Sequence, residues 1–177
     1  MAVERVRLKT ERLILQPIAP SHSKAIFAAV VASRQELLPW MPWAKEPTLA
    51  GTREAAAGSR RDWRAGARFR FAVVERATNM VLGVVGLDRE GHDSADLAYW
   101  IRSDHAGRGL TTEACRTLID WGTDTLGLSR VTLWAGRDNH ASRRVAVKLG
   151  FAHVGPLDWQ PEGGLGNFRA EMYERTI

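Results

Sequence analysis

The segment Tyr99–Ala114, YWIRSDHAGRGLTTEA, carries the most information in this chain of 177 residues. A β-type run ends near Ile101, the loop Gly107-Arg108-Gly109 follows, and from Leu110 apolar residues recur at helical spacing. A helix N-terminus exposes backbone N–H groups and carries partial positive charge, so this arrangement favours a bound phosphate. Glycine lets the backbone approach the anion closely, and the arginine can add a charged hydrogen bond. The spacing alone is not specific, because many strand–loop–helix turns use glycine for geometry only.

Two better-known phosphate motifs are absent. The chain has no Gly-Lys-Ser/Thr, which excludes the loop of nucleoside triphosphatases. It also has no GxGxxG after its first strand, which excludes the dinucleotide fingerprint.

The pattern around this segment predicts one α/β domain over residues 1–177 with a mixed sheet. Residues 38–47 carry three prolines and are expected to form a loop or a broken helix. Apolar residues at helical spacing predict helices from Pro20-Ser21 onward and over 110–126. Ala- and Arg-rich composition predicts a helix over 48–65, and a further short helix is expected over 139–149, ended by Gly150. Period-two runs predict strands over 12–17, 69–75, 81–89, 95–101, 130–135, 152–158 and 168–175, the last two joined at Gly163-Gly164.

Composition limits the compartment and the ligands. The chain has a net charge of +5 and a pI near 10.0, but no run of five like charges and no basic stripe with regular aromatics, so nucleic-acid binding is disfavoured. A polyanionic small ligand would profit from the same charge. With Cys115 alone and no clustered histidines, no disulfide, thiolate cluster or metal site is expected. No apolar run is long enough to span a membrane and the N-terminus lacks a signal core, so a cytoplasmic protein is expected.

The segment 99–114 resembles the pyrophosphate-binding loop of the GNAT superfamily of N-acetyltransferases, Gln/Arg-x-x-Gly-x-Gly/Ala. Both loop glycines and the Thr-Thr-Glu-Ala that follows fit, whereas Ala106 stands where Gln or Arg is frequent and Thr111 where Ala is common. Further blocks resemble the RimJ/RimL-type branch, whose known members acetylate protein N-termini. These blocks are LKTERLILQP (8–17), SRQELLPWMPW (33–43), DLAYWI (96–101) and NHASRRVAVKLGF (139–151).

The resemblance implies a mixed, mostly antiparallel sheet of seven strands, flanked by about four helices, in which the fourth and fifth strands splay apart. It also implies acetyl-CoA as cosubstrate. Backbone groups around Trp100 and Ile101 are then expected to pair with the pantetheine arm and to polarise the acetyl carbonyl. The expected pyrophosphate loop consists of Ala106, Gly107, Arg108, Gly109, Leu110 and Thr111.

Asn139 and Ser142 lie about one helical turn apart at the start of a helix. Taken locally, Asn139 caps the helix and Ser142 is an ordinary first-turn polar residue. By resemblance, Asn139 contacts pantetheine and Ser142 donates a proton to the departing thiolate. Asn139 can do both.

The general base is harder to assign. Asp96 is the favoured general base, because it lies where relatives often carry a Glu, although it can also be a solvated or structural carboxylate. Glu162 is an alternative in the late loop, where Gly163 and Gly164 suggest an ordinary turn. An α-amine has a pKa near 8, so a strong base is not required.

Trp40 and Trp43 are expected either to wall the acceptor pocket or to staple a proline-rich loop, whereas Trp63 and Cys115 are expected in the core. The favoured hypothesis is acetyl transfer to a protein N-terminal α-amine, by direct transfer in a ternary complex. The alternatives are a small-molecule amine as acceptor, a silent acyl-CoA-binding regulatory module and, last, a nucleic-acid-binding domain. The closing strands could also pair across a homodimer.

Overall fold

The strands form a single sheet in the computed structural model, which describes residues 3–157 and 169–177. Over these residues the sheet has eight strands in the order β1-β2-β3-β4-β5-β6-β8-β7, of which only β5 and β6 pair in parallel. The strands are β1 (Leu8–Lys9), β2 (Leu13–Pro17), β3 (Arg68–Glu75), β4 (Val81–Arg89), β5 (Ser94–Ile101), β6 (Arg130–Gly136), β7 (Ala152–Leu157) and β8 (Ala170–Thr176).

All seven expected strands are present, and the structure adds β1. That strand is only two residues long, too short for a period-two pattern to reveal it, and it pairs with β2. The expected turn at Gly163-Gly164 and the Glu162 side chain lie outside the described residues.

The four expected helices are confirmed, with a fifth of four residues, α2. The helix expected from Pro20-Ser21 starts later, because Pro20–His22 forms a separate 3-10 turn before α1. Residues 38–47 contain the 3-10 turn Pro42–Ala44, as a broken helix. The helices are α1 (Ser23–Ala32), α2 (Arg34–Leu37), α3 (Leu49–Arg64), α4 (Leu110–Leu126) and α5 (His140–Lys148).

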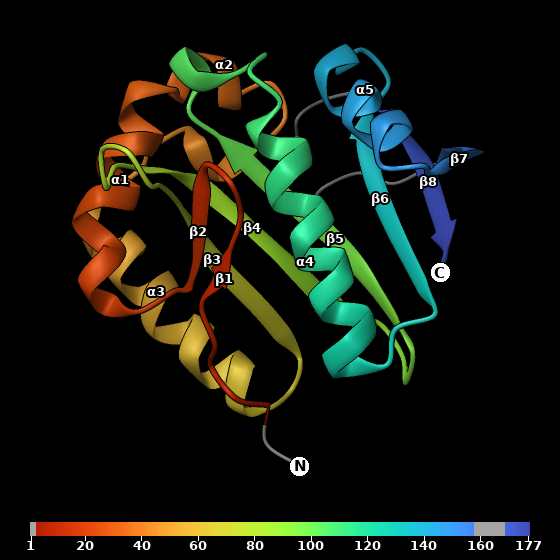
Figure 1. Cartoon of the computed structure of the whole chain (residues 1–177). Coiled ribbons are helices and arrows are strands. Elements are labelled where there is room, and N and C mark those ends of the chain that lie inside the picture. The colour runs from red at the N-terminus through yellow and green to blue at the C-terminus, as the bar shows by residue number, and fades with distance from the viewer. Residues whose placement is uncertain (1–2, 158–168) are drawn as a thin grey trace.

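Helix α4 crosses one face of the sheet, and Figure 1 shows it in front of β4 and β5, with α1 and α3 at the left of the view. The larger apolar cluster lies under α4 and contains Trp63 and Cys115, both buried as expected. Trp63 packs against two phenylalanines of β3 and against Trp121 of α4, with ring centroids 5.1–5.7 Å apart. Rings at these distances and tilts pack favourably, so this aromatic group anchors α4 to the sheet.

Strands β5 and β6 diverge, as the resemblance implied. They are paired only at Ser94–Arg130, Ala95–Val131 and Asp96–Thr132. Beyond this point β5 continues to pair with β4 as far as Ile101, whereas β6 follows β8. Among the described residues, the second half of β5 therefore has no strand neighbour on its β6 side, and a wedge opens in the sheet next to the start of α4.

Candidate active site

Residues 106–111, the expected pyrophosphate loop and hereafter the phosphate loop, have a backbone conformation that glycine favours. Gly107 has φ +76° and Gly109, the N-cap of α4, has φ +78°, a region that other residues rarely adopt. The loop is exposed, and the first N–H groups of α4 have no partner within the helix. The N–H of Ala106, by contrast, donates to the carbonyl oxygen of Ser103 at 3.1 Å. Any anion held here would therefore bind to the amides from Gly107 onward.

Two arginines flank this loop, and only one of them was expected. Arg108 is half exposed and pairs with Glu75 at the end of β3, 3.4 Å away. Arg12, at the start of β2, donates through Nη1 to the carbonyl oxygen of Arg108 at 3.0 Å and through Nε to Glu113 at 2.7 Å. Sequence reasoning missed Arg12 because 96 residues separate it from the loop and no local pattern marks it.

The wedge presents backbone groups of β5. A Cβ placed on Gly83 of β4 would lie 2.1 Å from the carbonyl oxygen of Trp100, so this oxygen is directed at β4. The C=O and N–H of one trans peptide unit point in opposite directions. The N–H of Ile101 is therefore directed away from β4, toward the wedge, where it can donate to a bound acyl carbonyl. Of the two residues expected here, Ile101 supplies this donor and the Trp100 carbonyl does not face the wedge.

Helix α5 brings Ser142 to the face of the sheet that carries the Tyr99 side chain. Asn139 caps this helix, its Oδ1 accepting from the backbone N–H of Ser142 at 3.0 Å. The Ser142 hydroxyl lies 2.7 Å from the phenol oxygen of Tyr99 on β5. Burial raises the pKa of Tyr99 well above its ordinary value, so the phenol keeps its proton. Tyr99 was missed, although a tyrosine two residues before Ile101 must share its face of the strand.

Asp96 lies on the opposite face of the sheet. It precedes Tyr99 by three residues, an odd spacing that reverses the direction of a strand side chain. Its carboxylate accepts hydrogen bonds from the Thr132 hydroxyl and from Trp134 Nε1, the latter at 2.8 Å. Burial, then a hydrogen bond with Asp96 and its charge, raise the pKa of nearby Glu90 to about 7. Asp96 and Ser142 are thus not neighbours; they stand on either side of the sheet where the wedge begins.

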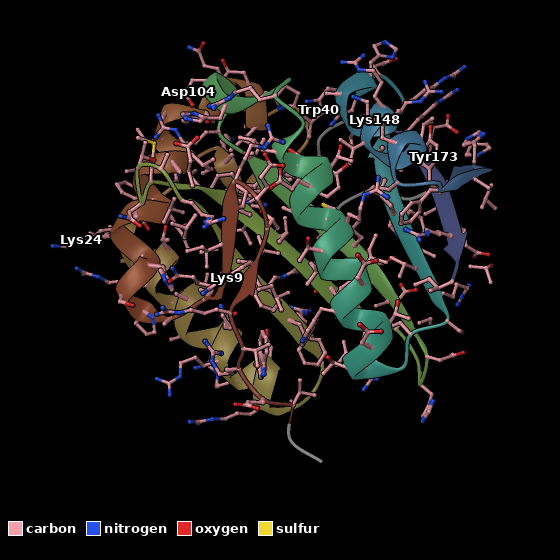
Figure 2. The ribbon with its side chains drawn as sticks, in the orientation of Figure 1. Lys9, Lys24, Trp40, Asp104, Lys148 and Tyr173 are labelled. Carbon is pink, nitrogen blue, oxygen red and sulfur yellow. The ribbon has the colours of Figure 1, made fainter. Side chains whose placement is uncertain are left out.

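The two loop tryptophans differ in what they contact. Trp43 is 51% exposed, and its ring centroid lies 6.0 Å from that of Trp100. Trp100 follows Asp96 by four residues, so both side chains face the same side of the sheet. Trp40 is partly buried and lies at the same end of the molecule as the start of α4 (Figure 2).

A cavity of about 390 Å³ lies along the outer side of α4, continuous with the phosphate loop at Gly109. Two cationic residues border it: Arg116 of α4 and Lys148 of α5, where Arg116 donates to the Lys148 carbonyl oxygen at 3.0 Å. Lys148 is the last residue of α5 and is labelled in Figure 2. The cavity is lined by Glu11, Gly109, Thr112, Glu113, Arg116, Thr117 and Lys148.

Within residues 3–157 and 169–177, no group of His, Cys, Asp and Glu is arranged to hold a metal ion. Over the same residues, no helix is both long and apolar enough to cross a bilayer.

Comparisons with known proteins agree with this geometry. Residues 12–152 match the model of the acetyltransferase (GNAT) domain. The chain is 27% identical to the uncharacterized N-acetyltransferase YoaA of Bacillus subtilis (strain 168), over 85% of both proteins. It is 24% identical to the ribosomal-protein-serine acetyltransferase of Escherichia coli (strain K12), over 84% of this chain and 83% of that protein.

Among solved structures, RimL, a ribosomal L7/L12 alpha-N-protein acetyltransferase in complex with coenzyme A, superposes with a TM-score of 0.88 at 20% identity. The match covers 97% of this chain and 98% of RimL, so the whole fold is shared. The glycine loop at the start of α4, the wedge between β5 and β6 and the family match lead to one conclusion: the chain belongs to the GNAT family of acetyltransferases, which use acetyl-CoA as acetyl donor.

Proposed function

We propose that this protein transfers the acetyl group of acetyl-CoA to the α-amine of a protein N-terminus, directly and within a ternary complex. The observation that carries the proposal is the contact of 2.7 Å between the Ser142 hydroxyl and Tyr99, on the face of the wedge that adjoins the phosphate loop. This contact supports Ser142 as the proton donor to the thioester sulfur.

The donor is expected to bind along one continuous path. The amides of Gly107 to Leu110 hold the pyrophosphate, and the wedge receives the pantetheine arm with Asn139 at its side. The N–H of Ile101 polarises the acetyl carbonyl. The cavity beside α4 would receive the nucleotide, with Arg116 and Lys148 near its phosphate.

The chemistry then needs no covalent enzyme intermediate. The amine nitrogen attacks the carbonyl carbon, the C–S bond breaks, and the departing sulfur takes the Ser142 hydroxyl hydrogen. Tyr99 is a positioning residue, because its phenol can donate to Ser142 Oγ and so direct the serine hydrogen toward the sulfur. The proton lost by the amine passes to Asp96 or to water, and solvent reprotonates Ser142.

The acceptor is expected to reach the wedge from the face that carries Asp96. Trp43 and Trp100 form an aromatic wall on that face, suited to the first residues of a peptide. An N-terminal amine is the favoured acceptor because the Escherichia coli relative is named as a ribosomal-protein-serine acetyltransferase and RimL as an alpha-N-protein acetyltransferase.

A peptide panel tests this proposal. Each peptide carries an internal lysine and begins with Ser, Ala or another residue, and a matched set has a blocked N-terminus. After incubation with acetyl-CoA, fragmentation mass spectrometry should find the acetyl group on the α-amine of free peptides only. Acetylation of small amines but of no peptide would mean that the acceptor is a small-molecule amine and not a protein N-terminus. Micromolar acetyl-CoA affinity without turnover on any amine would favour the regulatory module.

A further inference from the structure

We propose that Arg12 is a positioning residue of the acetyl-CoA site, which sets the shape of the phosphate loop and offsets a carboxylate beside it. The inference rests on the proposed acetyl-CoA site, and it assigns a role to a residue outside the loop itself. Arg12 comes from the β1–β2 hairpin, which lies beside α4 in Figure 1.

The first part of the argument is Glu113, a carboxylate in the first turn of α4. Arg12 donates to one of its oxygens through Nε at 2.7 Å, with Nη2 2.6 Å from the same oxygen. The other oxygen accepts from the backbone N–H of Arg12 at 3.0 Å and from the Thr10 hydroxyl at 2.5 Å. Burial alone would raise the pKa of Glu113, but these hydrogen bonds and the Arg12 charge lower it. Glu113 is therefore ionised at neutral pH.

The second part is the loop backbone. Arg12 Nη1 holds the carbonyl oxygen of Arg108 at 3.0 Å. Because C=O and N–H oppose each other in a trans peptide unit, this contact also sets the direction of the Gly109 N–H, away from Arg12. An amide held in one direction loses less conformational freedom when it binds an anion. The arginine fork, which reaches a carboxylate and a carbonyl together, is a geometry that lysine lacks.

Charge gives the third part. An ionised Glu113 beside the exposed N–H groups of α4 would repel a pyrophosphate. Arg12 offsets that charge, and a Cβ on Gly109 would lie only 3.7 Å from its Nη2. The Arg12 side chain is 44% exposed, so solvent screens the interaction and the effect on binding should be moderate.

Arg76 provides a matched control. Its Nη1 donates to the carbonyl oxygens of Thr10 and Glu11 at 2.9 and 2.8 Å, so it supports the same hairpin. These contacts involve the hairpin backbone and not the phosphate loop. Arg76→Ala should therefore reproduce any general loosening of the hairpin without the specific effect of Arg12.

The experiment compares two acetyl donors: acetyl-CoA and S-acetylpantetheine, which lacks the pyrophosphate and nucleotide. Arg12→Ala should weaken coenzyme A binding by ~5- to 10-fold in calorimetry, because solvent screens the contacts of its 44% exposed side chain. Its kcat/KM with S-acetylpantetheine should stay within about twofold of the unsubstituted protein, because that donor does not use the loop. Arg12→Lys should recover only part of the affinity. Arg76→Ala should keep the coenzyme A affinity within about threefold, since it leaves the loop contacts in place.

A double-mutant cycle isolates the charge effect. Glu113→Gln should make Arg12→Ala less costly for coenzyme A binding, because the carboxylate that Arg12 offsets is then gone. Unchanged coenzyme A affinity in Arg12→Ala, or an equal loss with both donors, would overturn the positioning role. Failure of the unsubstituted protein to bind coenzyme A is a different result: it would overturn the proposed donor site, and the role of Arg12 with it.

Discussion

Replacing Ser142 by alanine separates proton delivery to the sulfur from binding of coenzyme A. The variant keeps the backbone N–H that Asn139 caps, so α5 should keep its start. Tyr99 loses the hydroxyl at 2.7 Å but retains the Ser142 carbonyl oxygen, 3.4 Å away, as a second acceptor. The loss of stability should therefore stay near ~1 kcal/mol, the cost of one ordinary hydrogen bond.

The effect on turnover should be larger than the effect on stability. General acid catalysis contributes ~100-fold or more to a rate, and ~100-fold corresponds to ~2.7 kcal/mol of transition-state stabilisation. We expect Ser142→Ala to lower kcat by about that factor while the Kd for coenzyme A changes less than about twofold. Tyr99→Phe should lower kcat by only ~10-fold, because it removes the group that orients the donor and leaves the donor in place.

Steady-state release of thiol, measured with a saturating peptide acceptor, gives these rates. Thr123→Val is a suitable control, because the hydroxyl it removes donates within its own helix, to the Ile119 carbonyl oxygen at 3.0 Å. If Ser142 and Tyr99 act as one unit, the double variant should be no slower than Ser142→Ala. A kcat for Ser142→Ala within about threefold of the unsubstituted protein would refute the proton-donor assignment.

Three further changes test other parts of the site. Gly83→Ala should lower the free energy of unfolding by ~1–3 kcal/mol and weaken acetyl-CoA binding, because its Cβ would lie 2.1 Å from the Trp100 oxygen. Denaturant unfolding measures the first effect and calorimetry the second, and unchanged values would contradict the close approach of β4 and β5. The pKa of Glu90 is raised to about 7 in the folded protein. The contribution of Glu90 to stability is therefore complete at a pH below the pKa of the unfolded chain and is lost as pH rises through 7. Glu90→Gln should therefore raise the melting temperature at pH 8 and leave it unchanged at pH 4, whereas a parallel shift at both would be inconsistent with this titration. Trp43→Ala should raise the KM for a peptide acceptor by ~10-fold at constant coenzyme A affinity, and an unaltered acceptor KM would remove Trp43 from the acceptor wall.

Much of the fold could be predicted because its signals are local. Gly107 and Gly109 mark the loop because glycine adopts a positive φ most readily, and helical spacing after Leu110 marks α4. Asn139 was identified as a cap from its residue type and place, and its oxygen does accept from the third residue of α5. The two-residue strand β1 was missed because a pair of residues carries no period.

The chemistry of the site depends on contacts that no local pattern encodes. Tyr99 and Ser142 are 43 residues apart, and Arg12 and Glu113 are 101 apart. The positions of Asp96 and Ser142 on opposite faces follow only from the parity of β5 and the side on which α5 packs.

By itself, the sequence determined the order of the main elements, the position of the glycine loop and the family to which the chain is similar. These depend on backbone preferences and periodicity within a few residues. The tertiary structure alone decided which side chains meet: Tyr99 with Ser142, Arg12 with Glu113 and Arg108, and Trp43 with Trp100. The physical reason is that hydrogen bonds and ring contacts act over a few ångströms, and only the folded sheet brings distant segments that close.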